Sequence, residues 1–138
     1  MQKQPKFIIL EGTDRCGKTT LQLLLNKRFR YNHIILDRGP VGFQAYHEIF
    51  GRNPQTESYE DMEKSFKETN HLMIYLTCDT EEQLRRCYAT NESIQDFDYH
   101  KSVYEKYFKK SSLNKVMINT TNMKPNEIID YLIACNLL

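Results

Sequence analysis

The segment Gly12–Thr19, with the sequence Gly-Thr-Asp-Arg-Cys-Gly-Lys-Thr, is the feature that most constrains the fold of this chain. It fits the pattern G-x-x-x-x-G-K-[ST], in which a glycine-rich loop leads from a strand into a helix. The flanks agree with that context, because the apolar run Phe7–Leu10 precedes the loop and leucines at helical spacing follow it. A strand, this loop and a helix are therefore expected in succession.

The same loop is expected to bind a polyphosphate. Gly12 and Gly17 let the main chain turn its N–H groups inward, and the helix N-terminus adds partial positive charge. We expect Lys18 to reach the β- and γ-phosphates of ATP, and the Thr19 hydroxyl to be a ligand of Mg²⁺. The predicted nucleotide-binding residues are Gly12, Thr13, Asp14, Arg15, Cys16, Gly17, Lys18, Thr19 and Thr20.

The composition indicates one domain and a small ligand. The chain has 138 residues, of which 40% are hydrophobic, and residues 1–138 are expected to form a single domain. A formal net charge of +1 gives no general attraction to nucleic acid or to an anionic membrane, so neither is an expected partner. The apolar runs are too short to span a bilayer and no signal-type segment is present, which favours a cytoplasmic protein.

The four cysteines predict free thiols. They show no C-x-x-C spacing and no arrangement with histidine that would indicate a zinc site. Cys78, Cys87 and Cys135 are expected to be buried in the core. Cys16 lies in the loop and is expected to be more reactive.

Apolar runs alternate with helical patterns along the chain, which is typical of a parallel sheet with crossover helices. The predicted strands are Lys6–Glu11, His33–Asp37, His71–Cys78 and Lys115–Asn119. The predicted helices are Lys18–Arg30, Val41–Phe50, Glu57–Thr69, Glu81–Thr90, Asp98–Lys110 and Asn126–Asn136. Together they predict an α/β fold in three layers, with helices on both faces of a four-stranded parallel sheet.

A second polar group follows the predicted strand His33–Asp37. Ligands of parallel α/β sheets bind beyond the carboxyl ends of the strands, so Asp37 and Arg38 should lie beside the glycine-rich loop. Asp37 is expected to hold Mg²⁺ through a water molecule or to accept a proton from a hydroxyl group. Arg38 is expected to bind a phosphate group through two hydrogen bonds. Both are predicted catalytic residues.

These landmarks resemble the thymidylate kinases, a family of P-loop nucleoside monophosphate kinases. The segment Glu11–Thr20 resembles their phosphate loop, in the subtype with an arginine inside the loop, and Asp37-Arg38 resembles their Asp-Arg pair. Ile74–Leu76 resembles the next strand, and Thr80–Arg86 the helix that leads to the lid. The resemblance implies the P-loop kinase fold and transfer of the γ-phosphate of ATP, with Mg²⁺, to a nucleotide.

The resemblance also implies roles for three residues. In the family, the loop carboxylate contacts the acceptor sugar and the loop arginine stabilises the phosphoryl group during transfer. The arginine of the Asp-Arg pair binds the acceptor phosphate. These roles would fall on Asp14, Arg15 and Arg38, which makes Asp14 and Arg38 predicted substrate-binding residues.

The acceptor base needs a stacking partner of a different origin in this chain. Family members are longer. They carry an extra strand and acceptor-binding helices with a base-stacking aromatic residue, and this chain has almost nothing in their place between Arg30 and His33. Phe43 or Tyr46, in the helix after the Asp-Arg pair, is the predicted substitute, and Tyr59 is a third candidate.

The lid region is short as well. Tyr88–Asp98 contains no Lys or Arg, so positive charge for the transition state is expected from Arg15, Arg85 or Arg86. The resemblance places the adenine near Asn119–Asn122 and a lid arginine.

Three functions remain open on the sequence alone. A nucleoside monophosphate acceptor is ionised near pH 7 and needs no general base, so cations would matter most. A nucleoside or another hydroxyl acceptor would need a carboxylate, such as Asp37 or Asp14, to accept its proton. The third function is nucleotide binding without transfer. We take the first as the main prediction, with thymidylate as the acceptor by resemblance and a homodimer as the assembly considered.

Overall fold

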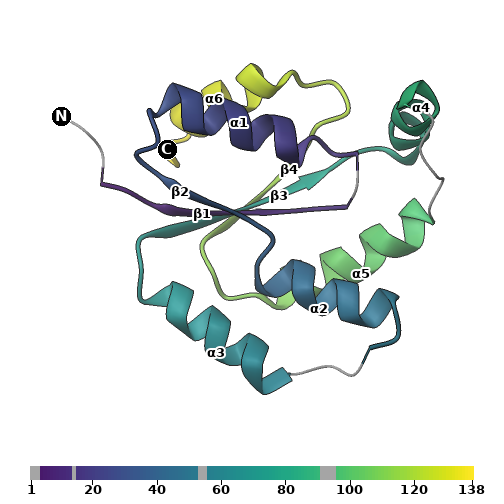
Figure 1. Ribbon diagram of the computed structural model, residues 1–138, viewed down its shortest axis with the longest axis horizontal. Coiled ribbons are helices and arrows are strands. Elements are labelled where there is room, and N and C mark those ends of the chain that lie inside the picture. Colours follow the sequence, from purple (N-terminus) through teal and green to yellow (C-terminus); the bar gives the residue numbers. More distant parts are fainter. Residues whose placement is uncertain (1–3, 14, 53–55, 91–95) are drawn as a thin grey trace.

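The computed structural model describes residues 4–13, 15–52, 56–90 and 96–138. Within these residues one sheet contains four strands, which are β1 (Phe7–Glu11), β2 (Ile34–Asp37), β3 (His71–Thr77) and β4 (Lys115–Asn119). Their order in the sheet is β2-β1-β3-β4, and every neighbouring pair is parallel (Figure 1). The predicted four-stranded parallel sheet is therefore confirmed.

Helices follow the strands as the sequence predicts. The described residues form α1 (Lys18–Arg28), α2 (Pro40–Ile49), α3 (Thr56–Lys67), α4 (Thr80–Thr90), α5 (Phe97–Lys110) and α6 (Pro125–Ala134). The ends of all predicted strands and helices agree with the structure to within two residues. No helix in these ranges is long and apolar enough to cross a membrane.

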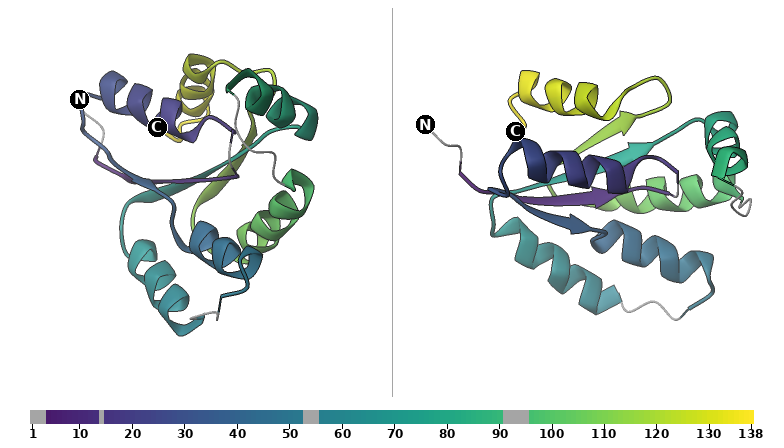
Figure 2. Two further views of the ribbon diagram at one scale, coloured as in Figure 1. Left: turned by 45° about the vertical axis from the view of Figure 1, so that its right-hand side comes forward. Right: turned by 45° about the horizontal axis from the view of Figure 1, so that its top comes forward.

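The sheet is covered on both faces, because alternate side chains of each strand point to opposite sides. Ile8 and Leu10 pack in one core cluster with side chains of α1 and α6. Ile9 packs in the other with side chains of α2 and α5. Figures 1 and 2 show α1 and α6 on one side of the sheet and α2, α3 and α5 on the other, which confirms the three-layer arrangement.

Helix α6 shows how local sequence sets an element and its packing. Pro125 occupies the first turn, where its missing N–H costs nothing, and the Glu127 side chain accepts a hydrogen bond of 3.0 Å from the Lys124 main chain. Ile128, Ile129 and Leu132 form the buried stripe against the sheet. Cys135, at the C-cap, is exposed, so its predicted burial is wrong: the residue lies past the last turn of the helix, outside that stripe. Cys78 and Cys87 are buried as predicted.

The carboxyl ends of all four strands lie at one edge of the sheet, since the strands are parallel. The loops after β1 and β2 meet there, and α4 lies beyond the same edge (Figures 1 and 2).

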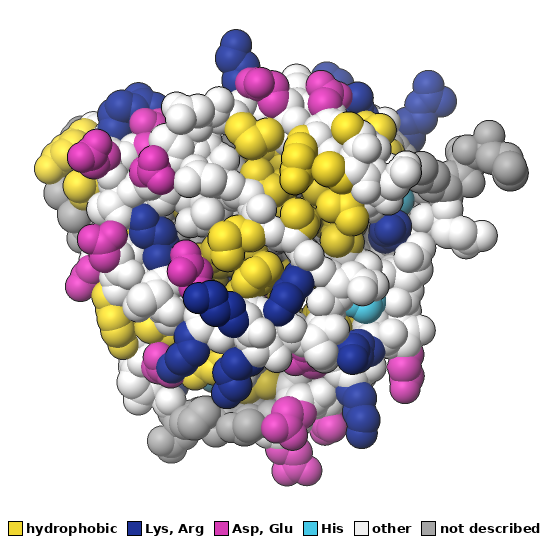
Figure 3. All heavy atoms as spheres, turned by 180° about the vertical axis from the view of Figure 1, so that it is seen from behind, with side chains coloured by type: hydrophobic (Ala, Val, Ile, Leu, Met, Phe, Trp, Pro, Cys, Tyr) yellow, Lys and Arg dark blue, Asp and Glu magenta, His cyan; other side chains and the backbone are white. Residues whose placement is uncertain are grey.

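Figure 3 shows the molecule from behind, relative to Figure 1. On this face a patch of apolar side chains lies among lysine and arginine side chains.

Candidate active site

The loop between β1 and α1 depends on two glycines for different reasons. Gly12 has a φ of 140°, and a Cβ atom on it would overlap the main-chain carbonyl of Leu76 in β3. Gly17 has a φ of 93° and is the N-cap of α1. The first glycine lets the loop pass close to the neighbouring strand, and the second turns the chain into the helix.

A cavity of about 340 Å³ opens where this loop meets the N-terminus of α1. It is lined by Thr13, Arg15, Cys16, Gly17, Lys18, Thr19 and Thr20. Of the other predicted nucleotide-binding residues, Gly12 is buried beneath the loop, and Asp14 lies outside the described residues. The first turn of α1 contains no acidic side chain, so no carboxylate of the helix itself opposes the partial positive charge at its N-terminus.

Polar side chains from other elements support the underside of the loop. Gln83 of α4 is completely buried and donates a hydrogen bond of 2.9 Å from Nε2 to Oγ1 of Thr13. The same nitrogen lies 3.6 Å from the Cys16 sulfur. Cys16 is buried, and its hydrogen bond to Cys78, together with burial, raises the pKa of its thiol. The prediction that Cys16 is more reactive is therefore wrong, because reactivity requires an accessible thiolate.

Arg86 of α4 braces the same loop. Its Nη1 donates to the Arg15 carbonyl at 2.5 Å, and its Nη2 donates to the Thr120 carbonyl at 3.2 Å. Glu82 accepts from Nε at 3.1 Å. Thr120 in turn donates from Oγ1 to the Cys16 carbonyl at 3.0 Å. The segment after β4 therefore lies directly against the phosphate loop.

Arg85 differs from Arg86 although the two are neighbours in α4. Its side chain is 68% exposed and pairs with Glu82 on the same helix. Arg86 is thus hydrogen-bonded to the loop, whereas the side chain of Arg85 lies at the protein surface.

One cavity on this side of the loop, which we call the α4/α6 cavity, has a volume of about 380 Å³. Its lining consists of Arg15, Cys16, Gly17, Thr20, Arg85, Arg86, Ala89, Thr90, Thr120, Met123, Pro125 and Ile128. The apolar side chains of this lining include Ala89, Met123, Pro125 and Ile128, and three arginines supply positive charge. Such a combination suits a flat apolar group attached to an anion.

Asp37 and Arg38 lie on the other side of the loop, as predicted. The Asp37 carboxylate is 3.9 Å from Nζ of Lys18 and is 59% exposed. Arg38 has a φ of 82°, a conformation that residues with a side chain rarely adopt. Its guanidinium lies 4.8 Å from the centre of the Tyr46 ring, within the range of a cation–π contact.

Arg38 lines a third cavity, of about 170 Å³, which we call the α2/α5 cavity. Thr13, Arg38, Tyr46, Ile49, Phe50, His100 and Tyr104 line it. The cavity combines one guanidinium with four aromatic rings. It can therefore hold a planar ring and an anionic group together.

The predicted aromatic residues fare differently. Tyr46 lines the α2/α5 cavity, whereas Phe43, one turn earlier in α2, is an exposed side chain outside that lining. Tyr59 is buried and its hydroxyl bonds with Nδ1 of His47, so the proposal of Tyr59 as a stacking surface is wrong. Phe50 was missed, although its position one turn after Tyr46 was a signal that could have found it.

Glu11 was also missed as a residue of the site. It ends β1, its side chain is completely buried, and it accepts a hydrogen bond of 2.6 Å from the Gly39 N–H. Burial raises the pKa of Glu11 to about 7, although the Gly42 and Gly39 main chains and the charges of Lys18 and Arg38 oppose that rise. The sequence offered one weak signal, an acidic residue in an otherwise apolar strand.

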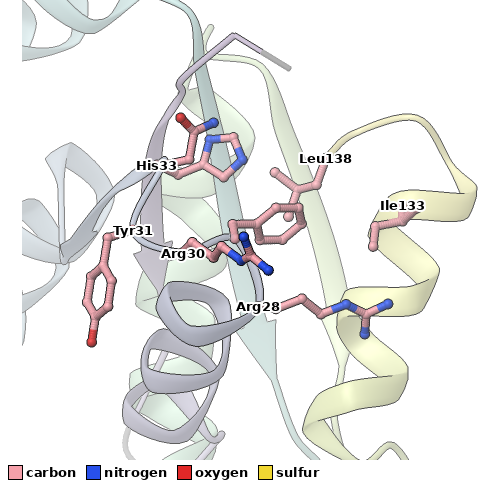
Figure 4. A pocket seen from close by; sticks show the side chains of 8 residues that line it. Arg28, Arg30, Tyr31, His33, Ile133 and Leu138 are labelled. Carbon is pink, nitrogen blue, oxygen red and sulfur yellow. The ribbon is translucent and has the colours of Figure 1, made fainter. Parts of the chain in front are cut away.

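A larger cavity lies at the other end of the molecule. It has about 500 Å³ and is lined by Arg28, Phe29, Arg30, Tyr31, Asn32, His33, Ile133 and Leu138 (Figure 4). Helix α1 separates it from the phosphate loop by its whole length, roughly 16 Å at 1.5 Å per residue. At its mouth Arg28 pairs with Asp130 of α6 at 2.8 Å. The residues that can hold a phosphate chain are therefore at the opposite edge of the sheet.

Comparison with solved structures identifies this architecture. The YorR protein of Bacillus subtilis, in complex with phosphorylated GDP, is 21% identical, with a TM-score of 0.83 over 95% of each chain. Thymidylate kinase of Candida albicans is 14% identical, with a TM-score of 0.60 over 96% of this chain and 91% of that chain. The chain has the fold of the P-loop kinases.

A third structure with the P-loop kinase fold agrees. Deoxyadenosine kinase of M. mycoides, with bound dCTP, is 15% identical, with a TM-score of 0.61 over 96% of this chain and 100% of that chain. No family model and no curated protein matches the chain. The expected thymidylate-kinase-like fold is thus confirmed.

Proposed function

We propose that the chain is a nucleoside monophosphate kinase that transfers the γ-phosphate of ATP. The observation that carries this proposal is the placement of two different cavities on opposite sides of one phosphate loop. The α4/α6 cavity suits the adenosine of the donor, and the α2/α5 cavity suits the acceptor. Lys18 and Arg15 lie in the loop between them.

The cations of the site fit phosphoryl transfer between two phosphates. Lys18 would bind the β- and γ-phosphates, Arg15 the group in transfer, and Arg38 the acceptor phosphate. Positioning and neutralisation of charge make up most of the catalysis of this reaction. Because the acceptor phosphate is already ionised near pH 7, the site needs no general base.

The residues present also fit a magnesium ion. Thr19 lines the cavity at the loop, and the Asp37 carboxylate is exposed beside Lys18. Hydroxyl and carboxylate oxygens are the ligands that Mg²⁺ takes in proteins, and phosphate and water oxygens complete its shell. When bound, Mg²⁺ would neutralise charge on the β- and γ-phosphates. Thr19 and Asp37 would hold it.

The α4 helix would contribute to the donor side. Arg86 holds the loop and the segment after β4 together, so it would shape the adenine site and support Arg15 through its carbonyl. Arg85 would approach the nucleotide from the rim. The adenine would lie between α4 and the segment Asn119–Asn122.

The acceptor is proposed to be a deoxynucleotide with an aromatic base held by Tyr46 and Phe50. The likeness to a thymidylate kinase supports thymidylate as the first choice. The YorR protein, solved with phosphorylated GDP, supports a test of guanine nucleotides as well. A homodimer also remains a proposal.

A nucleoside kinase is the second candidate. The exposed Asp37 carboxylate, 3.9 Å from Lys18 Nζ, lies where it could accept the proton of an attacking hydroxyl group. The likeness to a deoxyadenosine kinase supports this second candidate.

One experiment separates these functions. ADP release would be measured with ATP, Mg²⁺ and a panel of deoxynucleosides and their monophosphates. Turnover with monophosphates alone supports the proposal, and turnover with nucleosides alone supports the second candidate. If nucleotides bind but no member of the panel releases ADP, the chain is a nucleotide-binding module and the proposal is wrong.

A further inference from the structure

Glu11 lies at the junction of the phosphate loop and the Asp-Arg turn. It ends β1, directly before Gly12, yet its side chain contacts the loop that follows β2. The Gly39 N–H donates to its Oε1 at 2.6 Å, and Gly39 is both the N-cap of α2 and the residue after Arg38. One buried carboxylate therefore connects the end of the first strand to the turn that carries Arg38.

The Glu11 carboxylate packs closely against two glycines of α2 and its N-cap and against the side chain of Arg38. A Cβ atom on Gly42 would overlap both Oε2 of Glu11 and the Cγ of Arg38. A Cβ atom on Gly39 would lie 3.1 Å from Oε1 of Glu11. Because both positions are glycine, the carboxylate and the stem of Arg38 can pack against the first turn of α2.

The turn itself is strained, and two hydrogen bonds to β1 hold it. Arg38 has a φ of 82°, which an arginine adopts only when its surroundings enforce it. The Arg38 N–H donates to the Leu10 carbonyl at 2.9 Å, and the next N–H, of Gly39, donates to Glu11. Consecutive residues of β1 thus fix consecutive residues of the turn.

We propose that Glu11 is a positioning residue for Arg38. By holding the Gly39 amide, the Glu11 side chain keeps the strained turn in the conformation that directs the Arg38 guanidinium into the α2/α5 cavity. The inference rests on the proposed function, because the acceptor phosphate is the group that Arg38 would bind there. Loss of Glu11 should therefore weaken acceptor binding and leave ATP binding unchanged.

A simpler role for Glu11 would be to cap α2. A carboxylate at a helix N-terminus stabilises the helix by itself, and Gly39 offers no capping side chain. With that role alone, loss of Glu11 would lower the stability of the protein but would not affect acceptor binding and ATP binding differently. The measurements must therefore distinguish the two ligands.

The test compares Glu11→Ala, Glu11→Gln and Glu48→Gln with the wild type. Gln keeps one oxygen for the Gly39 N–H, and Glu48 is a matched control, since its carboxylate is also on the α2 side but pairs with Lys106 and Tyr107 of α5. The KM values for ATP and for thymidine monophosphate would be measured with kcat. The Nε–Hε NMR signal of Arg38, assigned through Arg38→Lys, would report the guanidinium directly.

We expect Glu11→Ala to raise the acceptor KM by about tenfold or more and to change the ATP KM by less than about twofold. Glu11→Gln should restore part of the acceptor KM, and Glu48→Gln should match the wild type. The Arg38 signal should move in both Glu11 variants. If the alanine variant does not fold, Glu11→Leu fills the same space without an acceptor oxygen.

Equal rises of both KM values, or an unmoved Arg38 signal in Glu11→Gln, would overturn the inference. Failure of the proposed function looks different: the wild type would then release no ADP with any monophosphate. In that case the Arg38 signal and the affinity for inorganic phosphate, measured by titration of wild type and Glu11→Gln, still decide whether Glu11 positions the guanidinium.

Discussion

The two sides of the phosphate loop are held by different means. On the α4/α6 side, side chains bind the main chain of the loop: Arg86 donates to the Arg15 carbonyl, and Thr120 donates to the Cys16 carbonyl. On the α2/α5 side, the main chain itself is bent, and Arg38 is held in a strained conformation by its bonds to β1.

With the proposed function, this difference would separate the tasks of the two sides. The α4/α6 side, which we propose for the donor, is braced by side-chain hydrogen bonds to main-chain carbonyls of the loop. The α2/α5 side, which we propose for the acceptor, depends on the direction of one guanidinium, and its cavity is the smaller of the two, at about 170 Å³ against about 380 Å³. Discrimination between substrates is therefore expected on the acceptor side.

The largest expected effect comes from Lys18, in the loop between the two cavities. Lys18→Ala removes the main charge on the β- and γ-phosphates, and kcat should fall by at least about a hundredfold. The measurement is steady-state ADP release. Lys27→Ala, a change in the exposed last turn of the same helix, is the control and should keep wild-type turnover. Near-normal turnover of Lys18→Ala would show that the loop is not the phosphate site.

The next effect concerns stability on the acceptor side. The pKa of the Glu11 carboxyl is about 7 in the folded protein, against the ordinary value of 4.5 that applies to the unfolded chain. Between these two pH values the folded state therefore holds a proton that the unfolded state has lost. The stabilisation is present at low pH and is lost as the pH rises through 7. The free energy of unfolding of Glu11→Gln relative to wild type should therefore rise by about 2 kcal/mol from pH 5.5 to pH 8.

Urea titrations at both pH values measure this difference. Glu48→Gln is again the control, because the Lys106 ammonium and the Tyr107 hydroxyl lower the pKa of Glu48, and its titration lies below this window. A flat difference for Glu11→Gln would mean that the buried carboxylate titrates like an exposed one.

Arg15→Gly separates transition-state stabilisation from binding. Glycine tolerates the φ of 67° at this position, so the loop conformation should survive while the guanidinium is lost. We expect kcat to fall by about tenfold or more with little change in the ATP dissociation constant, because the contact is made chiefly in the transition state. Calorimetric titration with a non-hydrolysable ATP analogue gives the second quantity. An equal loss of both would exclude this role for Arg15.

The features predicted from the sequence were those that depend on neighbours along the chain. Strands, helices and the loop follow from apolar periodicity and from glycines at fixed spacing, and the position of Asp37-Arg38 follows from the rule for parallel sheets. Gln83, His100 and Tyr104 could not be found in this way, because only the packing of α4 and α5 brings them to the loop. Tyr59 was misplaced because its partner, His47, lies on another helix.

The smallest expected effect tests the lining of the acceptor cavity with a matched pair on α2. Tyr46 lies in the cavity against Arg38, whereas Phe43, one turn away, is 37% exposed and outside its lining. Tyr46→Ala removes a ring that would contact the base and the guanidinium, so the acceptor KM should rise about threefold to tenfold. Phe43→Ala should leave that KM unchanged, and neither change should alter the ATP KM. If both variants raised the acceptor KM equally, the effect would belong to the stability of α2, and the aromatic lining would not explain how the smaller cavity selects its ligand.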